Sequence, residues 1–261
     1  MKKLVLALTA AAAFTGSAMA ADMAPRTYSK APAPVVAVAP SWTGCYLGAG
    51  GGGALTTNDH NDYATGTTIA AGPNLTTGAR GWLGTVQGGC DYQFNNFVVG
   101  AFADYDFMSV TGDVSTGGTF APSLFGTQKQ DQQWAVGVRA GYLVLPQLLT
   151  YVSGGYTQAH WQGTTLNTFA GQGGPAGSLL PGDTKGGWFL GTGDEYALTG
   201  FLPGLFWKTE YRYSEFDRSN VNESFGGALL GVSQTQKFRE NSVRSELVYR
   251  FNWAGPVVAK Y

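Results

Sequence analysis

Apolar and charged residues alternate with a period of two near the end of the chain. In residues 242–251 one parity is mostly apolar and the other is charged. The apolar positions are Val243, Leu247, Tyr249 and Phe251, and the charged positions are Arg244, Glu246 and Arg250. Successive side chains of a strand point to opposite faces, so this segment predicts a β-strand with one apolar and one charged face. A wall between lipid and a narrow polar lumen needs that combination.

The same alternation recurs in two other parts of the chain. Residues 205–213 set Trp207, Tyr211 and Tyr213 against Lys208, Glu210 and Arg212. Residues 134–142 set Trp134, Val136, Val138 and Tyr142 against Arg139. The pattern predicts an all-β fold, an antiparallel transmembrane β-barrel.

Eight strands are expected along the chain. They are residues 42–55, 81–94, 97–110, 132–145, 148–161, 186–201, 205–218 and 238–251. Short turns of Asn-Asn, Pro-Gln and Pro-Gly lie between some of them, at residues 95–96, 146–147 and 203–204. The other connections are long and rich in Gly, Thr, Ser and Asn: residues 56–79, 111–130, 162–185 and 219–237. This arrangement predicts an up-and-down barrel with short periplasmic turns, four long extracellular loops and both termini in the periplasm.

The N-terminus has the three regions of a secretory signal peptide. Lys2 and Lys3 precede an apolar run over residues 4–14, and Ala18-Met19-Ala20 follows it. We expect cleavage after Ala20, because the apolar run is shorter than the ~20 residues that an uncleaved membrane helix needs. The predicted organisation is residues 1–20 as signal peptide, 21–41 as an Ala/Pro-rich periplasmic linker, 42–253 as barrel and 254–261 as a short periplasmic tail.

Composition narrows the class of protein. With 13% aromatic residues, 13% charged residues and 39 glycines among 261, the chain is too apolar for disorder and too poor in charge for an ordinary cytosolic enzyme. Removing Lys2 and Lys3 leaves 14 basic against 17 acidic residues, a net charge of −3. Nothing in this balance favours a nucleic-acid partner.

Charged residues of the inward parity form the main candidate site. They are Asp91, Asp104, Asp106, Arg139, Glu195, Lys208, Glu210, Arg212, Arg244, Glu246 and Arg250, six acids against five bases. An eight-stranded barrel is only wide enough for side chains to fill its interior, so the near balance predicts a salt-bridged plug. Asp104 and Asp106 share a face of their strand, so they could serve as a general acid and a general base. Asp194 has outward parity beside Gly191 and Gly193, and a glycine-associated bulge is expected to turn it inward.

Other motifs give weaker signals. The two histidines, His60 in the first predicted loop and His160 at the outer end of a strand, could together bind haem or a metal. Isolated histidines without a ligand cluster are more often polar loop residues, so no cofactor and no metal are expected. Residues 50–53 are all glycine, but no Lys-Ser or Lys-Thr follows as a phosphate loop requires.

Several segments carry a family resemblance. They are residues 42–48 (WTGCYLG), 87–93 (QGGCDYQ), 208–213 (KTEYRY) and 249–251 (YRF) with the ending 255–261 (GPVVAKY). In this order the chain resembles the small alphaproteobacterial outer-membrane β-barrel proteins, called porin-family or outer-membrane immunogenic proteins. The resemblance implies an eight-stranded barrel among outer-membrane lipids and lipopolysaccharide, with the barrel assembly machinery as a partner. It also implies that the last strand, with Leu247, Tyr249 and Phe251, is the assembly signal.

The two cysteines are expected to form a disulfide. Cys45 and Cys90 lie toward the periplasmic ends of the first two predicted strands, in an exported and oxidising context. Placing them opposite each other fixes a register in which Tyr46 faces Gly89 and Gly53 faces Trp82, so that rings cover bare glycines. Two free cysteines that act as small apolar wall residues are the alternative.

The function expected from these features is that of a structural and surface-exposed outer-membrane protein and not an enzyme. The plugged barrel would serve as an anchor, and the loops would meet partners that the sequence does not identify. A small diffusion pore is the alternative. A haem-binding surface protein, a lipid A-modifying enzyme and a soluble lipocalin-like binder are further alternatives, although a lipocalin would need an apolar interior and a charged exterior.

Overall fold

The computed structural model describes residues 40–70, 74–116, 124–168, 178–198, 200–225 and 228–251. Within these ranges the regular elements are all β-strands. No helix among the described residues is long and apolar enough to cross a membrane. The predicted signal peptide, most of the predicted linker and the predicted tail lie outside the described residues.

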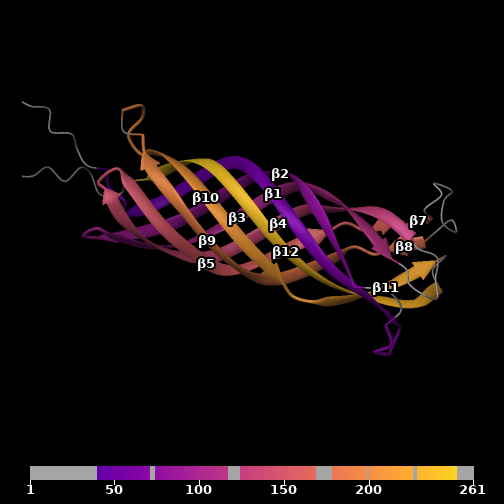
Figure 1. The fold of residues 1–261 in the computed structure, drawn as a ribbon. Coiled ribbons are helices and arrows are strands. Elements are labelled where there is room, and N and C mark those ends of the chain that lie inside the picture. Colours follow the sequence, from indigo (N-terminus) through magenta and orange to yellow (C-terminus); the bar gives the residue numbers. More distant parts are fainter. Residues whose placement is uncertain are drawn as a thin grey trace, which may run out of the picture. The chain divides into compact units, whose positions relative to one another are not determined.

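Eight strands form a closed antiparallel ring (Figure 1). They are β1 (Gly44–Ala64), β2 (Leu75–Phe94), β3 (Phe97–Thr116), β4 (Leu124–Leu145), β5 (Leu148–Trp161), β9 (Asp183–Ala197), β10 (Leu205–Phe216) and β12 (Ala228–Phe251). Each strand pairs with its neighbours in this order, and β1 pairs with both β2 and β12, which closes the ring. The predicted eight-stranded antiparallel fold is confirmed.

Short turns connect the strands at one end of the ring. Asn95 has a left-handed backbone (φ 53°) in the turn between β2 and β3, as the Asn-Asn pair predicts. The strand predicted for residues 186–201 ends earlier, at Ala197. The amides of Phe201 and Leu202 both donate to the carbonyl of Leu198, so this stretch forms a turn and leaves the strand ladder.

The long loops predicted at the other end are partly wrong, because much of each is strand. β1 continues past residue 55 to Ala64 and pairs with β12 as far as Val232. The short strands β6 (Thr164–Thr165), β7 (Asn167–Thr168), β8 (Ser178–Leu180) and β11 (Ser219–Phe225) also lie in this region. Thr56, Asn58 and their neighbours alternate between inward and outward positions even though both sets are polar. A strand that is polar on both faces has the same composition as a loop, which is why the sequence pattern predicted loops here.

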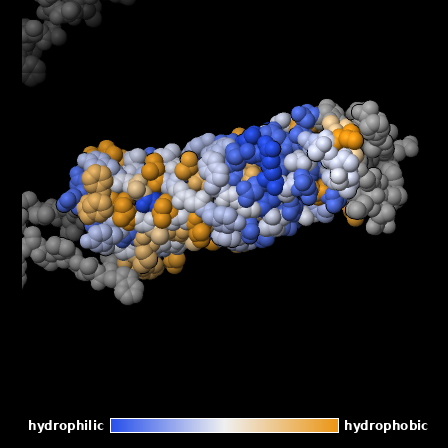
Figure 2. All heavy atoms as spheres, turned by 90° about the horizontal axis from the view of Figure 1, so that it is seen from below, coloured by the Kyte–Doolittle hydropathy of each residue, from blue (hydrophilic) through white to orange (hydrophobic). Residues whose placement is uncertain are grey.

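Outward apolar side chains form a belt around the half of the ring next to the short turns. Figure 2 shows hydrophobic residues gathered in that half of the face in view and hydrophilic residues toward the other end. Exposed aromatic residues bound the belt near the turns at Tyr92, Phe94, Phe97, Tyr142, Tyr249 and Phe251, and on its far side at Trp82, Phe107, Trp134, Tyr156 and Trp188. Aromatic girdles around an apolar band are typical of a membrane-spanning barrel.

A disulfide joins β1 to β2. Cys45 and Cys90 are bonded, with their Cα atoms 3.9 Å apart, and they face each other in the strand register. The same register pairs Tyr46 with Gly89 and Gly53 with Trp82, as predicted. A Cβ at Gly89 would lie 2.5 Å from the Tyr46 hydroxyl, so only glycine fits beneath that ring.

We expect the double variant Cys45→Ala with Cys90→Ala to unfold at lower urea concentration in detergent. The bond closes a loop of 45 residues, which is worth about 4 kcal/mol in the chain-entropy account. Unfolding is monitored through the loss of heat-modifiable gel mobility. Reduction of the wild-type protein should reproduce the shift and leave the variant unchanged; a wild-type midpoint insensitive to reductant would contradict the prediction.

A second prediction concerns the assembly signal. Leu247, Tyr249 and Phe251 point outward from β12 and are 55%, 42% and 43% exposed. We expect Phe251→Asp to reduce the amount of protein in the outer membrane more than removal of residues 253–261, because the charge interrupts the apolar face of the last strand. The measurement is immunoblotting of outer-membrane fractions. Equal levels of the two variants would count against it.

Candidate functional site

The interior of the ring is the candidate site. The structure places all eleven of the predicted charges there, and each is at most 6% exposed: Asp91, Asp104, Asp106, Arg139, Glu195, Lys208, Glu210, Arg212, Arg244, Glu246 and Arg250. Each of the eleven has an ion-pair partner within the set. They separate into two layers along the lumen.

The layer nearest the short turns is a closed square of two bases and two acids. Arg139 contacts Asp91 through Nε (3.0 Å to Oδ1) and Nη2, and its Nη1 lies 3.0 Å from Glu195 Oε2. Arg250 lies 2.7 Å from Asp91 Oδ2 and 2.6 Å from Glu195 Oε1. The four residues come from β2, β4, β9 and β12, so the square links strands on different sides of the ring. Its formal charge is zero.

Aromatic rings close this layer toward the turns. Trp42, which precedes β1, is completely buried, and its indole Nε1 donates to the carbonyl of Pro146 (3.2 Å). Arg250 donates to the Trp42 carbonyl (3.1 Å). The Tyr46 ring lies 4.7 Å from the guanidinium of Arg139 and 5.0 Å from that of Arg250. Trp42 lies within the first predicted strand (42–55) and shares the parity of Tyr46, so parity could have identified it as a lumen residue, although β1 begins only at Gly44.

Two arginines organise the second layer. Arg212 makes a bidentate contact with Asp104, at 3.0 and 2.7 Å. Arg244 lies 3.3 Å from Asp104 and 2.7 Å from Asp106. Both predicted acid–base candidates are thus held by guanidinium groups, and neither carboxylate is presented to an open space where a substrate would sit.

A lysine extends the second layer. Lys208 Nζ lies 3.2 Å from Glu210 and 3.4 Å from Glu246. Its third contact is the Gln87 carbonyl oxygen at 2.9 Å, and the Gln87 amide donates in turn to Glu246. The Tyr151 hydroxyl donates to Glu210 (2.8 Å). The layer holds three bases and four acids. Gln87 and Tyr151 are its neutral donors, whereas Asp106 Oδ1 and Arg244 Nε are buried without a hydrogen-bond partner among the described residues.

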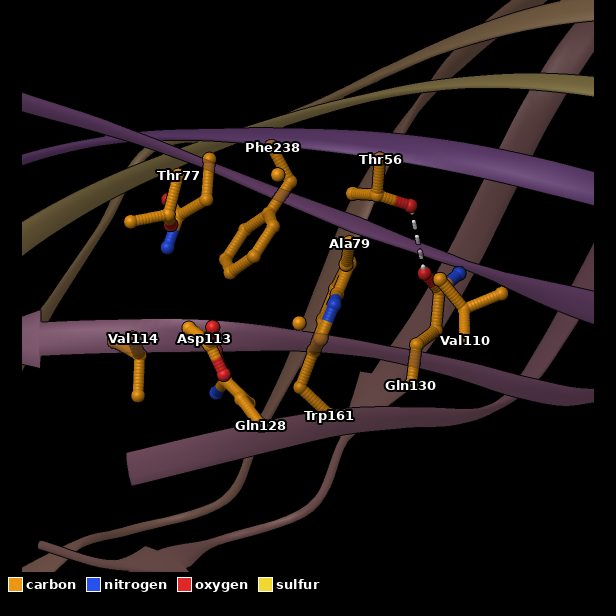
Figure 3. A pocket seen from close by; sticks show the side chains of 13 residues that line it. Thr56, Thr77, Ala79, Val110, Asp113, Val114, Gln128, Gln130, Trp161 and Phe238 are labelled. Atoms are coloured by element: carbon orange, nitrogen blue, oxygen red, sulfur yellow. Dashed lines mark hydrogen bonds between the residues drawn. The ribbon is translucent and has the colours of Figure 1, made fainter. Parts of the chain in front are cut away.

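Polar residues that the sequence analysis did not select continue the filling toward the far end. Glu240 is fully buried and accepts from Gln130 Nε2 at 2.7 Å, and Thr56 donates to Gln130 at 3.3 Å (Figure 3). A cavity of about 20 Å³ lies beside them, which is room for about one water molecule, and the buried Asn58 Oδ1 at its wall has no hydrogen-bond partner within the described part of the chain. Glu240 shares the parity of Arg244, so parity within the predicted strand could have identified it.

An aromatic cluster lies beyond the lipid belt. Trp161 stacks on Phe238 at 4.3 Å and packs edge-on against Phe216 at 5.0 Å. Lys185 Nζ lies 4.4 Å from the Phe238 ring and donates to Gln236 at 3.1 Å. Burial lowers the pKa of Lys185 to about 8. The interior is thus packed on the far side of the membrane belt as well.

The two histidines do not form a shared site. His60 lies on β1 with an inward, buried side chain, whereas the sequence analysis placed it in a loop. His160 is half-buried on β5 and lies 2.7 Å from Asp131. Among the described residues, no group of three or more His, Cys, Asp or Glu side chains could hold a metal ion.

Asp194 does not turn inward, so the predicted bulge is wrong. β9 keeps a regular register with β5 and β10 through this position, and the carboxylate stays on the outer face. Thr150 Oγ1 donates to it at 2.5 Å.

Comparisons with known proteins give relatives along nearly the whole chain. The chain is 33% identical over 259 residues to the 31 kDa outer-membrane immunogenic protein of Brucella melitensis biotype 1, covering 96% of this chain and all of the relative. The protein of the same name from Brucella suis biovar 1 matches equally well. The crystal structure of the outer membrane protein OprG from Pseudomonas aeruginosa matches with a TM-score of 0.51 at 12% identity, over 82% of this chain and 100% of that chain, which shows the fold alone. No protein-family model matches.

We expect Glu210→Ala to destabilise the folded protein by about 3–5 kcal/mol, because it removes the carboxylate that buried Lys208 and Arg212 share and leaves the layer with an excess of buried positive charge at that point. The measurement is urea unfolding in detergent. Glu215→Ala is the matched control on the same strand: its partner Lys237 is partly exposed, so the loss should be about 0–1 kcal/mol. Equal shifts for the two variants would show that the second layer is not packed.

Proposed function

Because the chain belongs to the family of the 31 kDa outer-membrane immunogenic protein, we propose that it is a structural, surface-exposed protein of the outer membrane. In this role the barrel anchors the chain, contributes to the integrity of the cell envelope and presents its far end to the outside. The lumen serves as a structural core and carries no solute.

The filled interior is the observation that carries this proposal. Two salt-bridged layers cross the lumen within the lipid belt, and Trp42 covers them at the short-turn end. Solutes could pass only if several buried ion pairs separated, and breaking a buried pair is strongly unfavourable. The arrangement therefore favours an anchor over a diffusion pore.

The proposed orientation places the short turns in the periplasm. The lipid belt lies next to those turns, and the strands continue well beyond it at the other end. Short periplasmic turns and longer outer segments are the general arrangement of bacterial outer-membrane barrels. Both ends of the barrel domain would then face the periplasm.

The extended far end suits surface display. Outward ion pairs link its strands, with Arg239 2.6 Å from Asp59 and Lys237 2.7 Å from Glu215. A hydrogen bond from Thr76 and the charge of Arg239 lower the pKa of Asp59. Together with the inner polar packing, these contacts stabilise the strands where they extend beyond the lipid belt.

Planar-bilayer recording tests the proposal. We expect refolded wild-type protein to give no discrete channels, because the layers close the lumen. An open porin recorded in the same bilayers shows that insertion and detection work, and heat-modifiable gel mobility shows that the tested barrel is folded. Reproducible channels of small-solute size from the wild type would instead establish a diffusion pore.

A further inference from the structure

The lipid-facing wall carries a hollow of about 930 Å³. Outward apolar side chains of four strands line it, namely Val99, Val138, Val152 and Leu190. Gly154 forms part of its floor, where a Cβ would lie 3.2 Å from Leu190 Cδ2. An apolar hollow of this size is in the range of small-molecule sites.

A second hollow of about 290 Å³ adjoins it toward the short turns. The two share Ala140 and Val152 in their linings. Phe97 and Tyr142 form one side of the second hollow, and their rings are 5.2 Å apart. The two hollows are thus adjacent on the outer wall, and together they are called the trough.

The end of the trough near the short turns is polar. Thr150 and Thr192 line it, and Asp194 lies beside them, directly opposite Thr150 in the strand register. Thr150 is the only described residue that bonds to the Asp194 carboxylate, and no Lys or Arg among the described residues pairs with it. Asp194 lies two positions from Tyr196, whose hydroxyl donates to Gln147 in the short turn. The carboxylate is therefore close to the edge of the lipid belt.

These features define the chemistry of the ligand. A lipid-facing carboxylate without a cationic partner is unfavourable, and an unfilled apolar hollow loses packing contacts. A lipid whose headgroup contains an ammonium group supplies a counter-charge for Asp194 and an acyl chain for the hollow. We propose that the trough binds one phospholipid with an ammonium headgroup, the ammonium at Asp194 and an acyl chain over Gly154.

The dimensions agree with this ligand. Asp194 and Leu190 are four residues apart on β9, which corresponds to about 10 Å along the membrane normal for a strand of ordinary rise and tilt. Half of the hydrocarbon core is about 15 Å, so the chain would point from the headgroup region toward the bilayer centre. With the orientation proposed above, this is the periplasmic leaflet; only that assignment rests on the proposed function.

A second copy of the chain fits less well. A barrel wall is convex, whereas the trough is concave and floored by glycine, so two walls would leave most of the hollow empty. Thr150 on β5 and Thr209 on β10 lie opposite Asp194 in the strand register, so hydroxyl groups flank it on both sides. A facing copy of the same surface would bring a second carboxylate toward the first and no cation.

Native mass spectrometry of the full mature protein tests the proposal. Protein from nanodiscs of equimolar phosphatidylethanolamine and phosphatidylglycerol should retain one phosphatidylethanolamine, with a preference of about two- to fivefold, the range of a single partly exposed ion pair. Asp194→Asn should abolish the preference, and Asp194→Glu should keep it. Ser245→Ala, also outward but away from the trough, is the control and should match the wild type.

A second variant tests the apolar part. Gly154→Leu places a side chain in the hollow, where only the flexible end of Leu190 must move, and should reduce retention of both lipids. Gly84→Leu adds the same side chain to open wall on β2 and should not. Equal retention of the two lipids by the wild type, insensitivity to Gly154→Leu, or a lipid-free dimer would each overturn the proposal. Bilayer conductance is scored separately, so a conducting barrel that still selects phosphatidylethanolamine would refute only the proposed function.

Discussion

The pairing of guanidinium groups with carboxylates inside the ring is the interaction on which the rest of the structure depends. Charges removed from water are costly unless their geometry is good and their remaining donors and acceptors are satisfied. Arg139 and Arg250 meet this condition by sharing Asp91 and Glu195, and Arg212 and Arg244 share Asp104. Each of the two charged layers joins several strands, so a shift of one strand would separate several ion pairs at once.

Small residues on β1 make room for these side chains. Gly50 and Gly52 have inward parity and lie opposite Glu246 and Arg244 of β12. A Cβ at Gly50 would lie 2.6 Å from the Glu246 Cα, so the close approach of the two strands requires glycine there. The glycine-rich run that resembles a phosphate loop in composition is thus explained by packing beside the charged layers.

The two faces of the wall change together along the barrel. Next to the short turns the outer face is apolar and the inner face charged, which suits lipid outside and ion pairs inside. Beyond Trp188 and Trp134 the outer face becomes polar while the interior keeps its hydrogen bonds and adds the Trp161 aromatic cluster. One continuous set of strands therefore carries both the apolar band and the polar extension beyond it.

The sequence alone indicated the ring of strands and the inward side of the eleven lumen charges, because both follow from a period of two; the Cys45–Cys90 register followed once the two cysteines were placed opposite each other. Tertiary structure decided which acid each arginine meets, since partners such as Arg250 and Asp91 lie far apart in the chain and are selected by geometry across the lumen. It also decided that residues 56–64 are strand: polar residues alternating around a polar interior give the same local signal as a loop. Parity alone places Asp194 on the outer face, and the cost of a carboxylate in lipid suggested a bulge that would turn it inward. The observed register has no bulge there and keeps the outward position.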